Sequence, residues 1–255
     1  MKEKKNDIIQ AVVGLIILII GIVLCVNTYV VKGNKAYAFS LLAAIIGAVV
    51  LISGIYSMFS TKEKKSIDAK VIAQAALCAA LCYIGATFIK IDIPVGTERT
   101  MFHFGNVFCV LAALLIGGAW GGLAGAVGMT ISDLTTAYVT SAPKTFFLKL
   151  CIGLIVGFVE HILFKISKEH SAKYVTIATV VSSICGMLFN VVADPIVGYF
   201  YKTYLLGVPQ DLAKTLAKIG AVTTSVNAVI AVVVASILYL ALRPVMKKSN
   251  MLRDL

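Results

Sequence analysis

The sequence predicts an all-α integral membrane protein with about eight transmembrane helices. The chain has 255 residues, of which 60% are hydrophobic and only 14% charged, and its mean hydropathy is +0.96. Soluble domains are about half apolar and a quarter charged. Runs of about 20 apolar residues, enough to cross a hydrocarbon core of roughly 30 Å, recur along the chain. They lie at 8–30, 38–60, 70–90, 103–117, 119–140, 145–165, 174–199 and 220–242.

The first two apolar runs predict a transmembrane hairpin at residues 1–61, and the other six predict one helical bundle at residues 62–255. The polar segment at 60–70 separates the two parts. The first run follows a basic start, as in a secretory signal, but it is longer than a signal's apolar region and no small-residue cleavage site follows. The hairpin has almost no polar residue at membrane depth, which favours a packing or insertion role over ligand binding.

Three segments between the later helices contain residues that can shape a cavity. "KIDIPVGTERTMFHFGN" at 90–106 combines charged, aromatic and turn residues, and "TSAPKTF" is a short turn. Residues 201–220 have the spacing of a short amphipathic helix that lies at the outer membrane interface. Long ordered connectors often act as lids, although an interfacial packing role is also compatible with this one.

The distribution of lysine and arginine predicts the orientation. If the N-terminus is inside, most of the 23 basic residues fall in cytoplasmic segments, so the positive-inside rule places both termini in the cytoplasm. The net charge of +11 is then explained by a basic inner face beside anionic lipid. No nucleic-acid partner is expected.

The sequence motifs give no indication of a cofactor or a metal site. The six cysteines lie in predicted spans without the spacing of a zinc module, and they are interpreted as packing residues. Cys78 and Cys82 share a helix face, but a ligand pair without nearby histidine or carboxylate is the weaker interpretation. The chain has no G-x-x-x-x-G-K-[ST] motif for binding ATP. We therefore expect no cofactor and no metal.

Small residues recur at intervals of four in two predicted helices. Gly117, Gly121 and Gly125 show this spacing in "GGAWGGLAGAVGMTISDLTT", and "AQAALCAAL" shows it with alanines. Such faces let neighbouring backbones approach closely in membranes. Two interpretations are open from spacing alone, namely packing inside one bundle and docking of an external partner helix.

Polar residues on several predicted helices lie at one depth. At about 1.5 Å per residue, Asp133, Lys149, Asn190 and Asn227 fall in the outer half of the bilayer. Ionisable groups in lipid are costly unless they are paired or face a cavity, so a shared polar cavity open to the outside is expected. Individually, Asn190 is also compatible with a bridge between helices, and Lys149 with a side chain that reaches the membrane surface.

Other polar residues extend or flank this set. His103 and Asn106 begin their span from the outer side, and Asp194 follows Asn190 on the same predicted helix. Because Asp194 precedes a proline, it is also compatible with a helix end at the interface. Glu160 and His161 lie near the inner surface, and we interpret them as a separate interfacial cluster.

The run "MFHFGNVFCVLAALLIGGAWGGLAGAVGMTISDLTTAYVTSAPKTFFLKLCIGLIVG", preceded by the alanine-rich helix, resembles the S component of energy-coupling-factor (ECF) vitamin transporters, within which it is most similar to the riboflavin-type group. The likeness covers about residues 70 to 245. It implies a six-helix S-component bundle that binds a vitamin on the extracellular side and delivers it by toppling in the membrane. The implied partners are a transmembrane coupling subunit and two cytoplasmic ATPase subunits.

The resemblance also implies a docking surface on the first helix of the bundle. The family's alanine motif, which contacts the coupling subunit, is matched here by Ala75, Ala76, Ala79 and Ala80. The N-terminal hairpin departs from the family pattern. It must leave the alanine face uncovered if the coupling subunit is to dock.

Two other function classes have less support. An intramembrane enzyme needs a catalytic constellation, but H-E-x-x-H, G-x-S-x-G and paired glutamate motifs are absent. Asp133 with His103 is the only candidate acid–base pair. A self-powered secondary carrier is expected to show inverted repeats and an ion site at the midplane, and neither is visible in the sequence. We therefore expect a transporter subunit and not an enzyme.

The resemblance and the shared depth together define the expected site. A flat vitamin, such as riboflavin or a pyridine or pyrimidine precursor, suits stacking on Phe102, Phe104 and Tyr138 with a few polar anchors. The sequence does not specify which vitamin is bound. The residues expected to bind substrate are Phe102, His103, Asn106, Asp133, Tyr138, Lys149, Asn190, Asp194 and Asn227.

Overall fold

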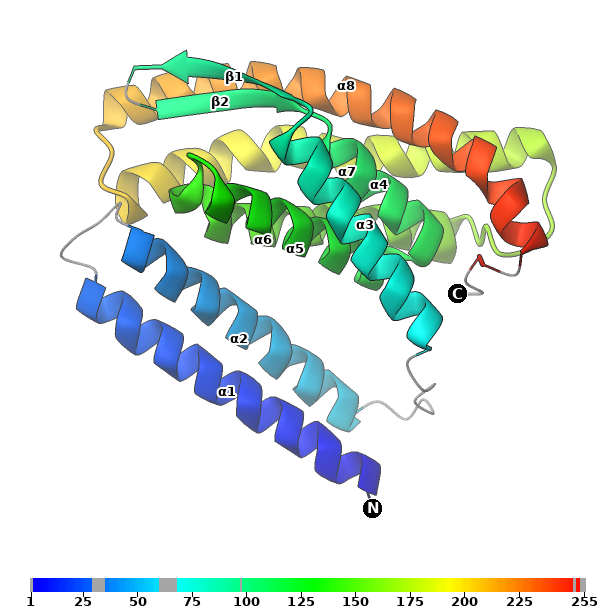
Figure 1. The fold of residues 1–255 in the computed structure, drawn as a ribbon, viewed down its shortest axis with the longest axis horizontal. Coiled ribbons are helices and arrows are strands. Elements are labelled where there is room, and N and C mark those ends of the chain that lie inside the picture. The colour runs from blue at the N-terminus through cyan, green and yellow to red at the C-terminus, as the bar shows by residue number, and fades with distance from the viewer. Residues whose placement is uncertain (1, 29–34, 60–67, 97, 250, 253–255) are drawn as a thin grey trace.

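The computed structural model describes residues 2–28, 35–59, 68–96, 98–249 and 251–252. Within these residues the chain forms eight α-helices and one pair of antiparallel strands (Figure 1). The all-α membrane architecture predicted from the sequence is confirmed. The elements are α1 (Lys2–Thr28), α2 (Lys35–Phe59), α3 (Ala69–Thr87), β1 (Lys90–Val95), β2 (Glu98–His103), α4 (Gly105–Ile116), α5 (Gly118–Thr135), α6 (Ala142–Gly157), α7 (Ala172–Phe200) and α8 (Gln210–Lys248).

Six stretches of helix in the described residues are long and apolar enough to cross a membrane. They comprise α1, α2, α3, α6 with the π-helical turn η3 (Phe158–Leu163), α7 with the π-helical turn η4 (Tyr201–Leu205), and α8. Helix α4 has 12 residues, which at about 1.5 Å per residue is too short for a core of roughly 30 Å. The strands β1 and β2 precede α4 along the chain, so this part of the bundle combines a half-length helix with a β-hairpin.

Helix α4 forms the centre of the bundle. It packs against α3, α5, α6 and α8, and Val107, Val110 and Leu114 are fully buried. Gly117 turns the chain from α4 into α5 with a φ of 85°, a conformation that favours glycine. The central position explains why α4 is apolar on all sides.

The glycines of α5 serve close packing inside the bundle. A Cβ atom added to Gly121 would lie 2.3 Å from the backbone nitrogen of Ala113 in α4, and one added to Gly128 would lie 2.1 Å from the carbonyl oxygen of Ala79 in α3. Gly122 faces the α6 backbone with a similarly short approach of 2.8 Å. Of the two interpretations left open by the spacing, internal packing accounts for these glycines.

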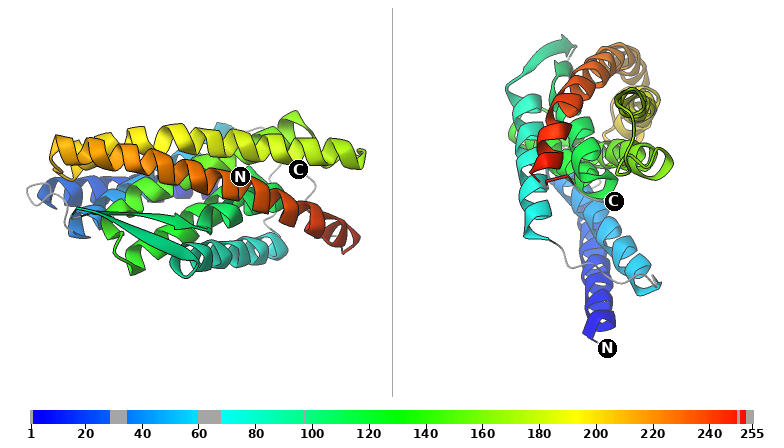
Figure 2. Two further views of the ribbon diagram at one scale, coloured as in Figure 1. Left: turned by 90° about the horizontal axis from the view of Figure 1, so that it is seen from above. Right: turned by 90° about the vertical axis from the view of Figure 1, so that its right-hand side faces the viewer.

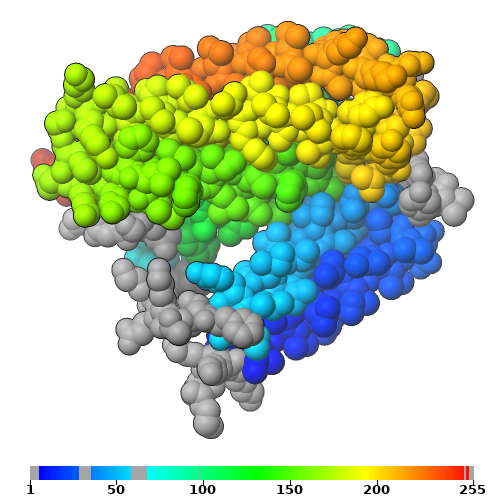
Figure 3. Space-filling view, turned by 180° about the vertical axis from the view of Figure 1, so that it is seen from behind, coloured from blue at the N-terminus to red at the C-terminus, as the bar shows by residue number. Residues whose placement is uncertain are grey.

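The N-terminal hairpin of α1 and α2 lies against one side of the bundle (Figures 1 and 2). Leu42 of α2 shares an apolar cluster with Ala126 and Phe146, and Tyr37 at the start of α2 packs against Tyr201. Toward the N-terminus the hairpin diverges from the green helices, as Figure 3 shows. The expected division between residues 61 and 62 falls outside the described residues.

Two connecting segments differ from the sequence-based expectation. The strands at residues 90–95 and 98–103 pair as a β-hairpin that was not predicted, with Lys90 paired to His103 and Val95 to Glu98. The expected interfacial helix at 201–220 is wrong, because η4 continues α7 and the chain from residue 210 onward already belongs to α8. Gly207, with a φ of 72°, and Pro209 interrupt the helices instead. The connector is therefore short.

The expectation that Glu160 and His161 form an interfacial cluster is also wrong with respect to Glu160, because its carboxylate is buried inside the protein. Glu160 has no exposed surface and accepts hydrogen bonds from Ser182 Oγ at 2.7 Å and Thr179 Oγ1 at 3.4 Å. The π-helical turn η3 thus directs the Glu160 carboxylate into the protein, toward α7. A rotation within one helical turn cannot be inferred from the distance along the chain alone.

The close approach at Gly128 makes a testable prediction about stability. We expect Gly128→Val to lower the melting temperature of the purified protein, because the added atoms overlap the Ala79 carbonyl and overpacking costs about 1–3 kcal/mol. The matched control is Gly220→Ala, where an added Cβ meets nothing within 4 Å. Equal melting temperatures for both variants would show that α3 and α5 are not packed as described.

Candidate functional site

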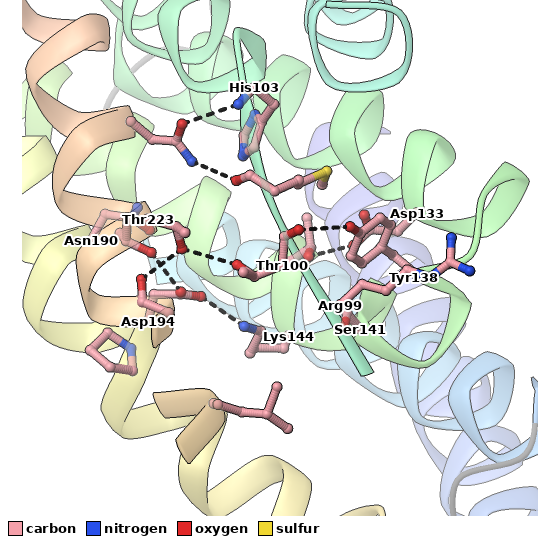
Figure 4. A pocket seen from close by; sticks show the side chains of 18 of the residues that line it. Arg99, Thr100, His103, Asp133, Tyr138, Ser141, Lys144, Asn190, Asp194 and Thr223 are labelled. Carbon is pink, nitrogen blue, oxygen red and sulfur yellow. Dashed lines mark hydrogen bonds and ion pairs between the residues drawn. The ribbon is translucent and has the colours of Figure 1, made fainter. Parts of the chain in front are cut away.

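A polar pocket lies between the β-hairpin and helices α5 to α8, at the end of the bundle that carries β1 and β2 (Figure 4). We call this the hairpin end. The cavity has a volume of about 120 Å³, smaller than the roughly 300–1,000 Å³ of most small-molecule sites. Its lining includes the sequence-predicted residues His103, Asn106, Asp133, Tyr138, Lys149, Asn190, Asp194 and Asn227.

The helices bring these residues together because each places a polar side chain at the same depth. Asp133 lies near the end of α5, Lys149 in the middle of α6, and Asn190 on α7. Their exposed fractions are 3%, 7% and 1%, respectively. A charged group at this depth is costly in lipid, and the common cavity provides the polar surroundings that individual helices lack.

The predicted aromatic surfaces are placed differently. Phe102 pairs with Ile91 across the β-hairpin and is not among the residues that line the pocket. Its neighbours on β2, Met101 and His103, do line the pocket. Phe104 precedes α4 and packs against the main apolar core. Of the three expected stacking residues, only Tyr138 lines the pocket.

Tyr138 holds the β-hairpin close to the pocket. Its hydroxyl donates a hydrogen bond to Asp92 Oδ1 at 2.7 Å and lies 3.2 Å from the carbonyl oxygen of Thr100. Burial acts to raise the pKa of Asp92, but the hydrogen bonds from Tyr138 and Lys90 outweigh it and hold that pKa below its usual value. Burial and the same bond to Asp92 raise the pKa of Tyr138. The phenol therefore stays protonated and the carboxylate ionised around neutral pH.

Asn227 uses its side-chain amide to hold β2 against α8. Its Oδ1 accepts a hydrogen bond from the backbone N–H of His103 at 3.1 Å, and its Nδ2 donates to the carbonyl oxygen of Met101 at 3.0 Å. Thr100 and Thr223 add a contact between their hydroxyls at 2.9 Å. Asn227 thus lines the pocket but acts chiefly as a positioning residue for the strand.

Asp194 is engaged by residues that the sequence did not identify. Lys144 Nζ lies 2.7 Å from Asp194 Oδ1, and Thr224 Oγ1 donates to Asp194 Oδ2 at 3.0 Å. Lys202 pairs with Glu98 at 2.9 Å and joins η4 to β2. Lys144 directly follows Pro143 near the start of α6. The proline was an available signal that a helix begins here, but it does not reveal which way the Lys144 side chain points.

Other groups of the pocket retain hydrogen-bonding capacity. Within the described residues, Asn106 Oδ1 is buried without a hydrogen-bond partner. His103 Nδ1 accepts from the backbone N–H of Gly105 at 3.1 Å, so the neutral ring carries its proton on Nε2. Asp133 Oδ2 accepts from the Thr145 hydroxyl at 2.5 Å. This arrangement can bind a solute with both donor and acceptor groups.

A comparison with known protein families identifies the family of the chain that forms this pocket. The family model described as "ECF-type riboflavin transporter, S component" matches residues 66–244. The chain belongs to this family. No curated protein and no solved structure matches it. The family is a component of a transporter and not a class of enzyme, and the protein is accordingly a multi-pass membrane protein.

The alanine motif of this S component divides between two sides of α3. Ala76 and Ala80 are exposed, whereas Ala75 and Ala79 are only partly exposed. The Ala79 carbonyl faces Gly128 of α5. The N-terminal helical hairpin contacts the bundle through α2, which packs against α6 and the turn η2 (Val139–Ser141). The exposed part of the alanine motif is therefore smaller than the four residues that the sequence suggested.

The role of Asn227 can be tested by removing its amide. We expect Asn227→Leu to lower the melting temperature and to speed amide hydrogen exchange in residues 101–103, because it leaves the bonded backbone groups of β2 unpaired. Each unsatisfied group costs about 1–3 kcal/mol. Ser225→Ala, on the exposed face of the same helix, is the matched control. Unchanged exchange in β2 would contradict the positioning role.

Proposed function

We propose that this S component is the substrate-capture subunit of an ECF-type importer. It binds a vitamin or vitamin precursor from the extracellular side and depends on a separate coupling subunit and two ATPase subunits for uptake. The observation that carries the proposal is the pocket at the hairpin end, where buried polar residues of α5, α6 and α7 meet. The excess of lysine and arginine near the other end supports cytoplasmic termini and an outward-facing pocket.

The proposed substrate is riboflavin or another flat heterocycle, including a pyridine or pyrimidine precursor. Tyr138 offers an aromatic surface, and Asn106, Asp133 and Asn190 offer polar anchors for ring nitrogens and oxygens. A cavity of about 120 Å³ is closer in size to a single ring than to a three-ring flavin. Mass spectrometry of the ligand that co-purifies with the protein tests this assignment directly.

The source of energy makes the second functional prediction. The described residues contain no nucleotide motif of the P-loop type, so we expect the purified protein to bind its vitamin without ATP. Concentrative uptake into vesicles is expected only when the coupling subunit and both ATPases are present. ATP-independent accumulation by the protein alone would identify a secondary carrier and overturn the proposal.

The proposed docking surface is the exposed side of α3 at Ala76 and Ala80. Residues four apart share one helix face, and alanine there allows close approach of a partner helix. The hairpin packs through α2 against α6 and η2, which supports access to this side of α3. Helix α3 contributes no side chain to the lining of the pocket.

Bulky substitutions on this face separate docking from binding. We expect Ala76→Trp and Ala80→Trp to abolish vitamin uptake in cells that contain the ECF module, because the larger side chain prevents close approach of the coupling subunit. Vitamin binding by the purified variants should stay at the level of the unmodified protein. Ala241→Trp, at an exposed alanine of α8, is the matched control and should preserve uptake.

Two results would count against the docking surface. Full transport by both α3 variants would assign the exposed alanines to ordinary lipid contact. Loss of binding together with transport would show that the substitutions damage the fold.

A further inference from the structure

Lys149 differs from the other lysines that line the pocket in having no acidic partner. Lys144 lies 2.7 Å from Asp194, and Lys202 lies 2.9 Å from Glu98. The Lys149 ammonium is 3.4 Å from the amide oxygen of Asn190. Within the described part of the chain, no carboxylate oxygen lies within 4.0 Å of it.

The burial of Lys149 makes this lack of an acidic partner significant. Its exposed fraction is 7%, and it projects from the middle of a membrane-crossing helix into the pocket. A buried charge without a close counter-charge is strongly unfavourable. A long hydrogen bond to a neutral amide compensates only a small part of that cost.

Asp133 does not serve as the counter-charge at ion-pair distance. Its Oδ2 accepts from Thr145 at 2.5 Å, and neither of its oxygens forms an ion pair with Lys149 among the described residues. Asp194 is already paired with Lys144 and bonded to Thr224. The positive charge of Lys149 therefore faces the cavity without a protein group that neutralises it at close range.

Asn106 adds a second and independent requirement. Its exposed fraction is 1%, it lines the same pocket, and its Oδ1 has no hydrogen-bond partner in the part of the chain that the structure describes. A buried amide oxygen of this kind is usually satisfied by a protein donor or a ligand. Among the described residues, the pocket thus offers one buried lysine without a carboxylate at ion-pair distance and one buried amide oxygen without a donor.

We propose that the pocket binds a small heterocycle that carries an anionic group, with the anion against Lys149 and an N–H or O–H donor against Asn106. The inference rests on the proposed vitamin-capture function and names the substrate class of that same site. The anion can be a carboxylate or a phosphate, since both accept charge-assisted hydrogen bonds from an ammonium group. The cavity of about 120 Å³ favours a single ring with a short acidic substituent.

Matched pairs of compounds test the anion separately from the ring. Nicotinate and nicotinamide differ in a carboxylate, and flavin mononucleotide and riboflavin differ in a phosphate. Binding of all four to the purified full-length protein is measured by isothermal titration calorimetry at neutral pH. In at least one pair we expect the anion to bind about tenfold or more tightly than its neutral counterpart.

The variant Lys149→Met removes the charge but keeps a long apolar side chain. We expect it to reduce the preference for the anion to within about twofold while binding of the neutral compound is preserved. Lys218→Met is the matched control, because Lys218 is exposed on α8 and does not line the pocket. It should leave the preference unchanged.

A measurement without any ligand tests whether the cation of Lys149 is unpaired. We expect Lys149→Met to raise the melting temperature of the ligand-free protein, because it removes an uncompensated buried charge. If Lys149 instead neutralises Asp133 or Asp194, the same substitution leaves a carboxylate unpaired and lowers the melting temperature. This readout does not depend on the choice of heterocycle.

The outcomes separate this inference from the proposed function. A preference for the neutral compounds, or an anion preference that survives Lys149→Met, would overturn the anion assignment and leave vitamin capture standing. If none of the four compounds binds, a higher melting temperature of ligand-free Lys149→Met supports the assignment, and a lower or equal one overturns it. Failure of the proposed function appears instead as uptake that does not require the ECF module.

Discussion

The cost of placing polar side chains inside a membrane-crossing bundle is the constraint on which the rest of this structure depends. A polar group in lipid must be paired, hydrogen-bonded or open to a polar cavity. Here Asp133, Lys149 and Asn190 come from three different helices and open into one pocket. The constraint thus selects the rotation of each helix as well as its depth, since any of these side chains would otherwise face lipid.

That convergence requires the helices to pack closely around a short central helix. Gly121 and Gly128 let α5 approach α4 and α3 to distances that a side chain would prevent. Because α4 is only 12 residues long, space remains at the hairpin end of the bundle for the pocket. The β-hairpin lies beside that space and contributes its second strand to the lining. Close packing in one half of the bundle and a polar cavity in the other are therefore two consequences of one arrangement.

The β-hairpin is attached by a few polar contacts and not by an apolar core. Tyr138 binds Asp92, Asn227 binds the backbone of β2, and Lys202 pairs with Glu98. A hydrogen bond of this kind contributes about 0.5–1.5 kcal/mol net, far less than the burial of several large side chains. The walls of the pocket consequently differ in character, with a helical side fixed by packing and a strand side held by individual bonds.

The sequence by itself determined the membrane class, the helices and the depth at which Asp133, Lys149 and Asn190 lie, because apolar length and residue spacing are local properties. It also carried the resemblance to the S-component family. Only the tertiary structure decided which atoms remain free in the pocket. Lys144 pairs with Asp194 across 50 residues, and Asn227 reaches β2 across more than a hundred. Such contacts depend on strand register and helix rotation, which long-range packing sets and spacing along one helix does not reveal.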